Sequence, residues 1–309
     1  MFFNQTRNVH GIFLLDKPIG ISSNQALQLV KKIFSIKKAG HGGSLDPLAT
    51  GLLPIFLGEA TKFSKYLLKS SKKYRVIAKL GEQTSTADSF GRIENVFKVK
   101  INSSLYESAL DKFRGKIVQV PPIYSAIKYK GKPLYQYARK GISVPIKKRI
   151  IKVYKLENLY RKNEIIELEI FCSSGTYIRS IIHDLGKLLR CGAHVIFLRR
   201  LKVFSYSINQ SVNFDQLFFF KKKYNKNFLF FLNKLKNFII PVHSMLSSFP
   251  KVFISQKEHS YIKNGKSIKL LKNFQSGLVR IMSKSGKFFG LGKINENRYL
   301  FPHRLINFF

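Results

Sequence analysis

The stretch from residue 39 to residue 68 constrains the fold of this chain more than any other part of the sequence. It opens with a turn whose three glycines can adopt the positive φ angles that other residues resist: Gly40, Gly42 and Gly43. Asp46 comes next, and Pro47 biases it toward an extended conformation. An apolar run over residues 52–57 is short enough for a buried strand, and residues 59–68 have the pattern of an amphipathic helix. The sequence therefore predicts a carboxylate on a rigid loop, directly before a buried strand and close to His41.

Acidic residues are scarce in this chain, so each carboxylate is informative. The sequence contains 16 aspartates and glutamates against 55 lysines and arginines. Of the aspartates, only Asp16 and Asp46 lie among apolar residues and glycines, whereas Asp88 lies in a polar turn. An aspartate in a turn rich in glycine and proline commonly stabilises that turn or caps a helix. The spacing alone therefore leaves both a catalytic and a structural role open for Asp46.

Residues 40–54, which read GHGGSLDPLATGLLP, resemble the signature of the TruB family, the bacterial tRNA pseudouridine-55 synthases. The family pattern is G-H-x-G-x-L-D-P-x-A-x-G-x-L-P, and the residue after the histidine, commonly threonine in the family, is Gly42 here. A second run over residues 172–181, CSSGTYIRSI, is similar to another signature of the family, and residues 192–201 are similar to its G-A-x-x-x-x-L-R-R strand.

This resemblance implies roles for particular residues. Asp46 is the implied catalytic nucleophile and Arg179 its partner, since a guanidinium favours the ionised form of a carboxylate and fixes its orientation. Leu198 and Tyr177 are implied to line the uridine pocket and Tyr74 to stack on the base. The complete set of substrate-binding residues is His41, Tyr74, Tyr177 and Leu198, and Lys17 and Lys62 are candidates for RNA contacts.

These residues also have plainer interpretations. A tyrosine on a strand commonly packs in the core, and a helix with an arginine at position 179 can be an ordinary amphipathic helix with a solvated charge. His41 can stabilise a turn, and Lys17 can be a solvated turn residue. The resemblance favours the functional interpretation of Tyr74 and Arg179 and leaves both interpretations open for His41 and Lys17.

The charge balance indicates an anionic partner. A net charge of +39 attracts polyanions, of which nucleic acid is the commonest. Codon bias toward lysine, asparagine, isoleucine and phenylalanine is a second explanation of this charge, and it is compatible with binding to nucleic acid. The two cysteines, Cys172 and Cys191, indicate neither a disulfide framework nor a metal site, so we expect a cytoplasmic protein without metal or cofactor. No apolar run approaches the roughly 20 residues that span a bilayer, and no signal-peptide pattern is visible.

The order of predicted elements indicates an α+β fold with two parts. The expected strands fall at residues 11–15, 52–57, 72–81, 149–161, 163–172 and 192–201. The expected helices run from a cap at Ser22 or Ser23 to about Phe34, over residues 59–68, 104–113 and 134–140, and from about residue 176. The resemblance implies that residues 1–245 form a catalytic pseudouridine-synthase domain, with a mixed, mainly antiparallel sheet flanked by helices. Residues 250–309 are expected to form a small β-barrel similar to a PUA-type RNA-binding domain.

Two segments differ in composition from the rest. Residues 120–146 interleave aromatic residues with cations, which is typical of contact with RNA. The resemblance implies an insertion that clamps the RNA, and an ordinary surface excursion is the alternative. Residues 214–238 are rich in phenylalanine and lysine with weak helical periodicity, and no function is assigned to them.

The reaction implied by the resemblance is isomerisation of uridine to pseudouridine at position 55, in the T arm of tRNA. It breaks the N1–C1′ bond and joins C5 to C1′ without redox change, so an aspartate suffices and no cofactor is required. The base must be flipped out of the folded arm. We expect a monomer that acts on tRNA without a protein partner. A non-catalytic RNA chaperone would not need an Asp46–Arg179 pair, and a synthase guided by a separate RNA would need partner proteins to modify bare tRNA.

Overall fold

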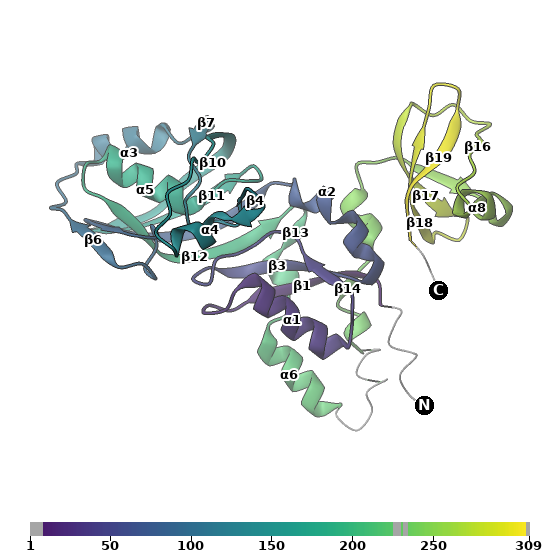
Figure 1. Cartoon of the computed structure of the whole chain (residues 1–309), viewed down its shortest axis with the longest axis horizontal. Helices are drawn as coiled ribbons and strands as arrows, with labels where there is room; N and C mark the ends of the chain where they lie inside the picture. The colour runs from purple at the N-terminus through teal and green to yellow at the C-terminus, as the bar shows by residue number, and fades with distance from the viewer. Residues whose placement is uncertain (1–8, 225–229, 231–233, 307–309) are drawn as a thin grey trace.

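The computed structural model describes residues 9–224, residue 230 and residues 234–306 (Figure 1). Most of this chain forms one wide sheet with helices packed against it, and the C-terminal part forms a smaller sheet to one side. The sequence-based expectations for residues 1–8, and for residues 225–229 and 231–233 of the low-complexity stretch, lie outside the described residues.

Ten strands of the described chain join into one mixed, mainly antiparallel sheet. In spatial order it contains β14 (Ile239–Ile240), β1 (Gly11–Lys17), β3 (Thr50–Leu57), β12 (Ala193–Val203), β4 (Lys72–Leu80), β11 (Ile165–Cys172), β10 (Arg149–Lys162) and β7 (Gly115–Gln119), with β2 (Ala39–His41) on β3 and β13 (Tyr206–Ser207) on β12. β3 and β12 run parallel, and the other neighbours pair antiparallel. This order places β3, the strand that follows Asp46, next to β12, which comes much later in the chain.

The strands near the C-terminal sheet are buried on both faces, because they lie between two apolar layers. On β1, Phe13 and Leu15 belong to the main core, whereas Ile12 and Leu14 point to the opposite face and join a second core. β4 instead alternates buried residues with partly exposed ones such as Arg75. The apolar run over residues 52–57 is therefore a fully buried strand, as the sequence predicted.

Helices cover the sheet face that carries the main core (Figure 1). α1 (Ser23–Phe34) begins at Ser22, whose hydroxyl accepts from the Gln25 amide while the Gln25 side chain accepts from the Ser22 amide. The remaining helices that bury an apolar face here are α3 (Ser103–Asp111), α5 (Ile178–Leu188) and α6 (Phe214–Lys223). The predicted helix from Ser22 or Ser23 to Phe34 is confirmed, with Ser22 as its cap.

The helix expected over residues 59–68 consists of two pieces. A 3₁₀ helix, η2 (Gly58–Phe63), comes first and α2 (Ser64–Leu68) follows it. The tighter first piece aligns Ala60 and Phe63, three residues apart, so both are buried in the second core.

The C-terminal residues form a five-stranded sheet with one helix, α8 (Gln256–Lys263). Its spatial order is β15 (Lys251–Ile254), β17 (Gly277–Ser283), β18 (Phe288–Ile294), β19 (Tyr299–Leu305) and β16 (Ile268–Lys269). Met282, Phe288 and Leu291 pack into the second core of the large sheet, with 3₁₀ helix η4 (Val242–Leu246) beside them. The Lys62 ammonium donates to the Leu305 carbonyl at 3.0 Å. The two sheets are therefore joined by one continuous apolar contact.

The fold confirms the predicted α+β class, the mixed sheet flanked by helices and a β-rich, PUA-like C-terminal part. The hairpin expected over residues 149–172 is β10 paired with β11. The domain boundaries near residues 245 and 250 stay a prediction. In the part of the chain that the structure describes, no helix is both long and apolar enough to cross a membrane.

Candidate active site

Asp46 lies on the loop between β2 and β3, and this loop is fastened to the neighbouring helix. The Ser23 hydroxyl accepts from the Leu45 amide at 2.7 Å and donates to the Leu45 carbonyl at 3.0 Å. The Asp46 carbonyl accepts from the Ala49 amide at 3.0 Å. These bonds fix the backbone on both sides of the carboxylate, so its position does not depend on the flexibility of the loop.

A buried arginine holds the same loop from the sheet side. Arg200 on β12 is 1% exposed, and its guanidinium donates to the carbonyls of Leu52 at 2.8 Å, Gly43 at 3.0 Å and Ser44 at 3.3 Å. The parallel pairing brings the two backbones very close at Gly51, which has a φ of +100°. A Cβ on Gly51 would lie 2.4 Å from the Arg200 carbonyl oxygen, so the pairing requires glycine there.

The three glycines before Asp46 differ from expectation. We expected positive φ angles at all three, but of these only Gly43 has one, at +110°. Gly40 lies in the short strand β2. Gly42 is buried, and a Cβ there would lie 3.1 Å from Leu67 and 3.3 Å from Phe56, so glycine serves close packing.

Arg179 contacts Asp46, as the sequence predicted. It lies in the first turn of α5, is 4% exposed, and its Nε is 2.9 Å from Asp46 Oδ2. Its Nη1 is 3.4 Å from Asp88 Oδ2 and donates to the Thr86 carbonyl at 3.0 Å. Its Nη2 donates to the Tyr124 carbonyl at 2.9 Å. All three guanidinium nitrogens are engaged, so the cation is fixed between two carboxylates.

The electrostatics of Asp46 combine opposing influences. Burial raises the pKa of the carboxyl above its ordinary value, Arg179 lowers it, and the charge of Asp88 raises it again, with burial the largest influence. The side chain remains 37% exposed toward the pocket. Water therefore still reaches the carboxylate, and a molecule that covers the pocket would displace this water.

Five of the predicted site residues meet in one pocket of about 340 Å³: Asp46, Tyr74, Tyr177, Arg179 and Leu198. Tyr74 on β4 and Leu198 on β12 are 9% and 4% exposed and stand on the same face of the sheet. Tyr177 is the residue directly before α5. These five residues therefore bring one carboxylate, one guanidinium, two phenols and an apolar wall to the pocket from four distant segments.

His41 and Lys17 do not line this pocket. His41 lies on β2, burial lowers its pKa, and its Nδ1 has no hydrogen-bond partner among the described residues. Lys17 is fully buried, and its ammonium donates to the carbonyls of Pro18 at 2.7 Å and Ile21 at 2.8 Å. Burial lowers the pKa of Lys17 to about 8. This placement argues against a phosphate contact for Lys17, because backbone carbonyls already surround its charge.

Lys62 lies outside the pocket as well. Its ammonium pairs with Glu59 and donates to the Leu305 carbonyl of the C-terminal sheet. This lysine therefore connects the two sheets, and the RNA contact expected of it stays a prediction. Asp16, the other aspartate in apolar surroundings, forms a two-pronged ion pair with Arg199 at 3.0 and 2.6 Å, which gives it a structural role.

Three family models together match residues 31–306 of this chain. Residues 31–178 match the TruB family pseudouridylate synthase N-terminal domain. Residues 179–247 match the tRNA pseudouridylate synthase B C-terminal domain, and residues 250–306 match the C-terminal part of pseudouridine synthase II TruB. This chain belongs to the TruB family.

Curated relatives support the family membership along the whole chain. A tRNA pseudouridine synthase B of Buchnera aphidicola is 48% identical over 309 residues, which is 99% of each chain. Proteins with the same name from Photorhabdus laumondii and Escherichia coli are each 47% identical over 97% of this chain and 96% of their own length. The expectation of an isomerase of this family is thereby confirmed.

Solved structures share the fold of this TruB-family chain. A chain in "Structure of H/ACA RNP bound to a substrate RNA containing 2'-deoxyuridine" superposes with a TM-score of 0.70 at 23% identity, covering 96% of this chain and 85% of that chain. A chain in "Crystal Structure of a Cbf5-Nop10-Gar1 Complex" gives 0.68 at 26%, covering 94% and 79%. These likenesses confirm the pseudouridine-synthase fold.

Sequence reasoning about this TruB-family site missed Asp88. It lies between β5 (Glu82–Thr84) and β6 (Ile93–Val96), is 5% exposed, and its Oδ1 accepts from the Thr86 hydroxyl and the Phe90 amide. Its other oxygen faces Arg179. The polar turn TADSFG suggested solvent, and only the scarcity of acids could have singled this residue out.

A buried amide joins the start of the insertion to the segment just before α5. The Gln119 side chain, 2% exposed, donates to the Tyr177 carbonyl at 3.0 Å and accepts from the Tyr177 amide at 2.9 Å. The insertion then forms β8 (Lys128–Tyr129), β9 (Lys132–Pro133) and α4 (Leu134–Ala138). The ring of Tyr129 meets that of Tyr137 edge-on at 5.9 Å between centroids. The first part of the insertion is therefore anchored at the pocket, and its distal part carries the aromatic residues outward.

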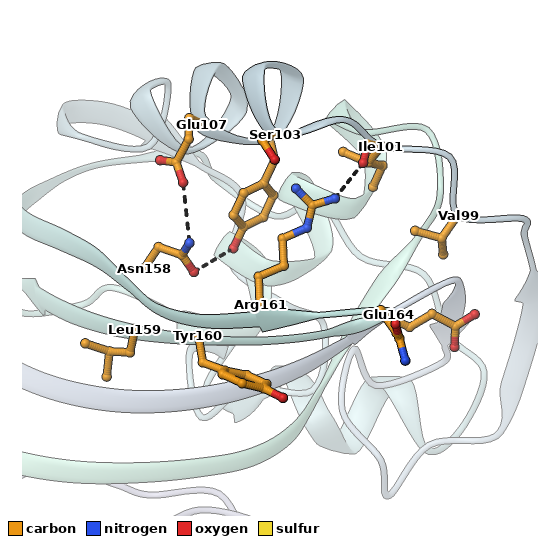
Figure 2. A pocket seen from close by; sticks show the side chains of 11 residues that line it. Val99, Ile101, Ser103, Glu107, Asn158, Leu159, Tyr160, Arg161 and Glu164 are labelled. Atoms are coloured by element: carbon orange, nitrogen blue, oxygen red, sulfur yellow. Dashed lines mark hydrogen bonds between the residues drawn. The ribbon is translucent and has the colours of Figure 1, made fainter.

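A larger hollow of about 850 Å³ lies elsewhere, between α3 and the β10–β11 hairpin (Figure 2). Tyr106 donates to Asn158 at 3.3 Å, and the Asn158 amide donates to Glu107 at 3.4 Å. Arg161 lies over the Tyr106 ring and donates to the Ile101 carbonyl at 2.6 Å. These groups form hydrogen bonds with one another, whereas the smaller pocket contains the Asp46–Arg179 pair.

Metal ligands do not gather at either hollow. Throughout residues 9–224 and 234–306, no three His, Cys, Asp or Glu side chains lie close enough together to hold a metal ion. Both cysteines are buried and unpaired.

Proposed function

We propose that this chain isomerises uridine to pseudouridine at position 55, in the T arm of tRNA, with Asp46 as the nucleophile. The observation that carries the proposal is the Asp46–Arg179 contact of 2.9 Å inside a pocket that can hold one nucleoside. The names of the relatives, tRNA pseudouridine synthase B, support tRNA as the substrate.

The mechanism follows from what each side chain can do. Arg179 orients the carboxylate and favours its ionised form, which the reaction needs. The N1–C1′ bond of the uridine breaks, the base turns and C5 joins C1′. The C5 proton is then lost, N1 gains a proton, and any bond that Asp46 forms to the nucleoside breaks again, so the product is an isomer and no co-reactant is needed. Tyr74 and Tyr177 flank the space where the base would turn.

The target base must leave its stack to reach Asp46. Flipping a nucleotide costs a few kcal/mol, and stacking on an aromatic ring returns about 1–3 kcal/mol. We therefore assign Tyr74 to stacking on the flipped base, with Leu198 on the opposite wall and His41 near the RNA loop. Ordinary packing of Tyr74 in the core remains the competing interpretation.

The division of the chain is part of the proposal. Residues 1–245 would form the catalytic domain, with residues 120–146 as a clamp on the RNA, and residues 250–309 a PUA-like RNA-binding domain. Interleaved tyrosines and cations support the clamp, since Lys130 lies over Tyr129 and Arg139 over Tyr135. We propose that the chain acts as a monomer on bare tRNA and without a protein partner, unlike a guided synthase.

The test is pseudouridine mapping by mass spectrometry in bare tRNA incubated with purified protein, compared between the natural chain and Asp46→Asn. We expect modification at position 55 to disappear in the variant while tRNA affinity stays within about twofold. The variant should remain folded: the folded-state pKa of Asp46 is raised, so the ionised carboxylate costs stability at neutral pH, and a neutral amide removes that cost.

The control is Asp215→Asn, an exposed aspartate in the first turn of α6, which should retain full activity. Turnover by Asp46→Asn would exclude Asp46 as the nucleophile. Activity that appears only when partner proteins are added would favour a guided synthase, and RNA binding without modification would favour a chaperone.

A further inference from the structure

The catalytic pocket contains a hydroxyl that the mechanism above does not use. Ser125, in the first part of the insertion, lines the pocket with Asp46 and is 4% exposed. Within the described chain, no donor or acceptor completes a hydrogen bond with its Oγ. Its backbone is held on both sides, since its amide donates to the Ile123 carbonyl at 2.9 Å and its carbonyl accepts from the Tyr135 amide at 3.1 Å. A buried hydroxyl without a partner is rare and disfavoured, so this one requires an explanation.

The pocket's cations are already committed to the protein. The guanidinium nitrogens of Arg179 bind Asp46 and two backbone carbonyls, and those of Arg200 bind three backbone carbonyls. The Lys72 ammonium donates to the carbonyls of Leu68 at 2.7 Å and Ser70 at 2.6 Å. Few strong donors are therefore left for a neutral, carbonyl-rich ligand, which raises the importance of each hydroxyl in the lining.

We infer that Ser125 Oγ is a substrate-binding group that donates a hydrogen bond to one of the two ring carbonyl oxygens of the flipped uracil. This inference rests on the proposed function. Uracil presents two carbonyl acceptors, and an uncommitted hydroxyl on a fixed backbone can meet one of them without rearrangement. In the free protein a water molecule can occupy the same position, because the hydroxyl borders the open pocket.

The neighbouring phenol supports the placement of this hydroxyl. Burial raises the pKa of Tyr177, and an interaction with the Ser125 hydroxyl opposes that effect, although the two hydroxyls do not meet in hydrogen-bond geometry. Ser125 therefore stands at the side of the pocket where Tyr177 lies, on a segment that Arg179 also contacts through the Tyr124 carbonyl. A base between Tyr74 and Tyr177 would have an edge within reach of this wall.

The first experiment compares Ser125→Ala with the natural protein in single-turnover pseudouridine formation. We expect the rate to fall by about three- to tenfold, the range for one neutral hydrogen bond. The melting temperature should stay equal or rise, since the substitution removes an unpartnered buried hydroxyl, and tRNA affinity should change by less than about twofold. The matched control is Ser103→Ala, an exposed serine on α3 far from the pocket, which should change none of these.

The second experiment identifies the contact with tRNA that carries 2-thiouridine or 4-thiouridine at the target position. A thiocarbonyl is a weaker hydrogen-bond acceptor than a carbonyl, so one of the two analogues should slow the natural protein and leave Ser125→Ala almost unaffected. If Ser125→Ala is both slower and less stable than the natural protein, the comparison of the two analogues shows whether the slower rate comes from a lost hydrogen bond to the base or from a damaged fold. An unchanged rate in Ser125→Ala, or equal slowing of both proteins by both analogues, would overturn the inference.

The two proposals fail in different ways. If the natural protein forms no pseudouridine in tRNA, the proposed function is wrong. If the natural protein is active, Asp46→Asn is inactive and Ser125→Ala matches the natural rate, only the role of Ser125 is wrong.

Discussion

Replacing Arg179 by methionine tests whether one buried cation holds both carboxylates in place. The change removes the charge beside Asp46 and Asp88 and leaves the Thr86 and Tyr124 carbonyls without their donor. Breaking a buried ion pair costs about 3–5 kcal/mol. The side chain of Asp46 is 37% exposed and partly screened, whereas that of Asp88 is 7% exposed. We therefore expect the free energy of unfolding to fall by about 3 kcal/mol, mainly because the Asp88 charge loses its partner. For a chain of 309 residues, that loss corresponds to a melting temperature lower by about 5 °C.

The cost of Arg179→Met should depend on pH in a defined direction. The guanidinium stabilises the ionised carboxyl of Asp46, so this contribution is present above the pKa of Asp46 and is lost as the pH falls through it. The difference in unfolding free energy should therefore be largest near about pH 7 and should narrow as the pH falls through the pKa of Asp46, which burial raises above its ordinary value. In the double variant Asp88→Asn/Arg179→Met, removal of one unpaired charge should recover part of the loss.

The assay is urea unfolding at several pH values, with single-turnover pseudouridine formation measured on the same samples. The matched control is Arg75→Met, because Arg75 is 50% exposed and pairs with Glu167 on the open sheet face. Loss of the Arg75–Glu167 ion pair should lower the free energy of unfolding by less than about 1 kcal/mol. A cost below about 1 kcal/mol for Arg179→Met, or a difference that does not change with pH, would refute the reasoning that this cation compensates two buried charges.

Four further expectations follow from the site and the fold. Tyr74→Leu should slow single-turnover catalysis more than it weakens tRNA binding, and an unchanged rate would count against stacking on the base. The rate should fall at acid pH with a midpoint above the ordinary aspartate value of about 3.9, because burial raises the pKa of Asp46 and the carboxylate must be ionised; a lower midpoint would disagree. Gly51→Ala should destabilise the protein by about 1–3 kcal/mol in urea unfolding, since its Cβ would lie 2.4 Å from the Arg200 carbonyl oxygen, and a neutral effect would contradict the close β3–β12 approach. Affinity for tRNA should decrease steeply with salt because phosphate contacts release counterions, and a flat response would mean that the charge of +39 reflects composition alone.

Local patterns in the sequence were sufficient for many of the elements, and the family resemblance supplied the Asp46–Arg179 pair. The apolar run over residues 52–57, the Ser22 cap and the hairpin over residues 149–172 each carry a short-range signal, and each formed as predicted. The Asp46–Arg179 contact joins distant segments of the chain, and the hydrophobic periodicity of the sequence does not predict it. It came from the resemblance of two separate motifs to one family, and the structure brings the two residues together.

Roles that depend on burial could not be predicted from local sequence. Lys17 and Lys62 read as surface cations, but backbone carbonyls engage both of them in the folded chain. Asp88 read as a solvated turn residue, but the pairing of neighbouring segments buries it beside Arg179. Arg200 fastens the Asp46 loop through carbonyls from three residues, which depends on the parallel β3–β12 pairing. Such roles arise from strand order, which no single segment encodes.

The continuous apolar contact between the two sheets has a consequence for how the protein would recognise a large ligand. Met282, Phe288 and Leu291 of the smaller sheet share a core with η2 and α2, the turns that follow the signature strand. If RNA contacts both sheets, this shared apolar core fixes the distance between Asp46 and the surface of the smaller sheet that the RNA contacts. The protein would then select an RNA by the spacing and bend of its arms before the target base enters the pocket. A packing defect in the shared core would weaken that selection without altering any side chain of the pocket.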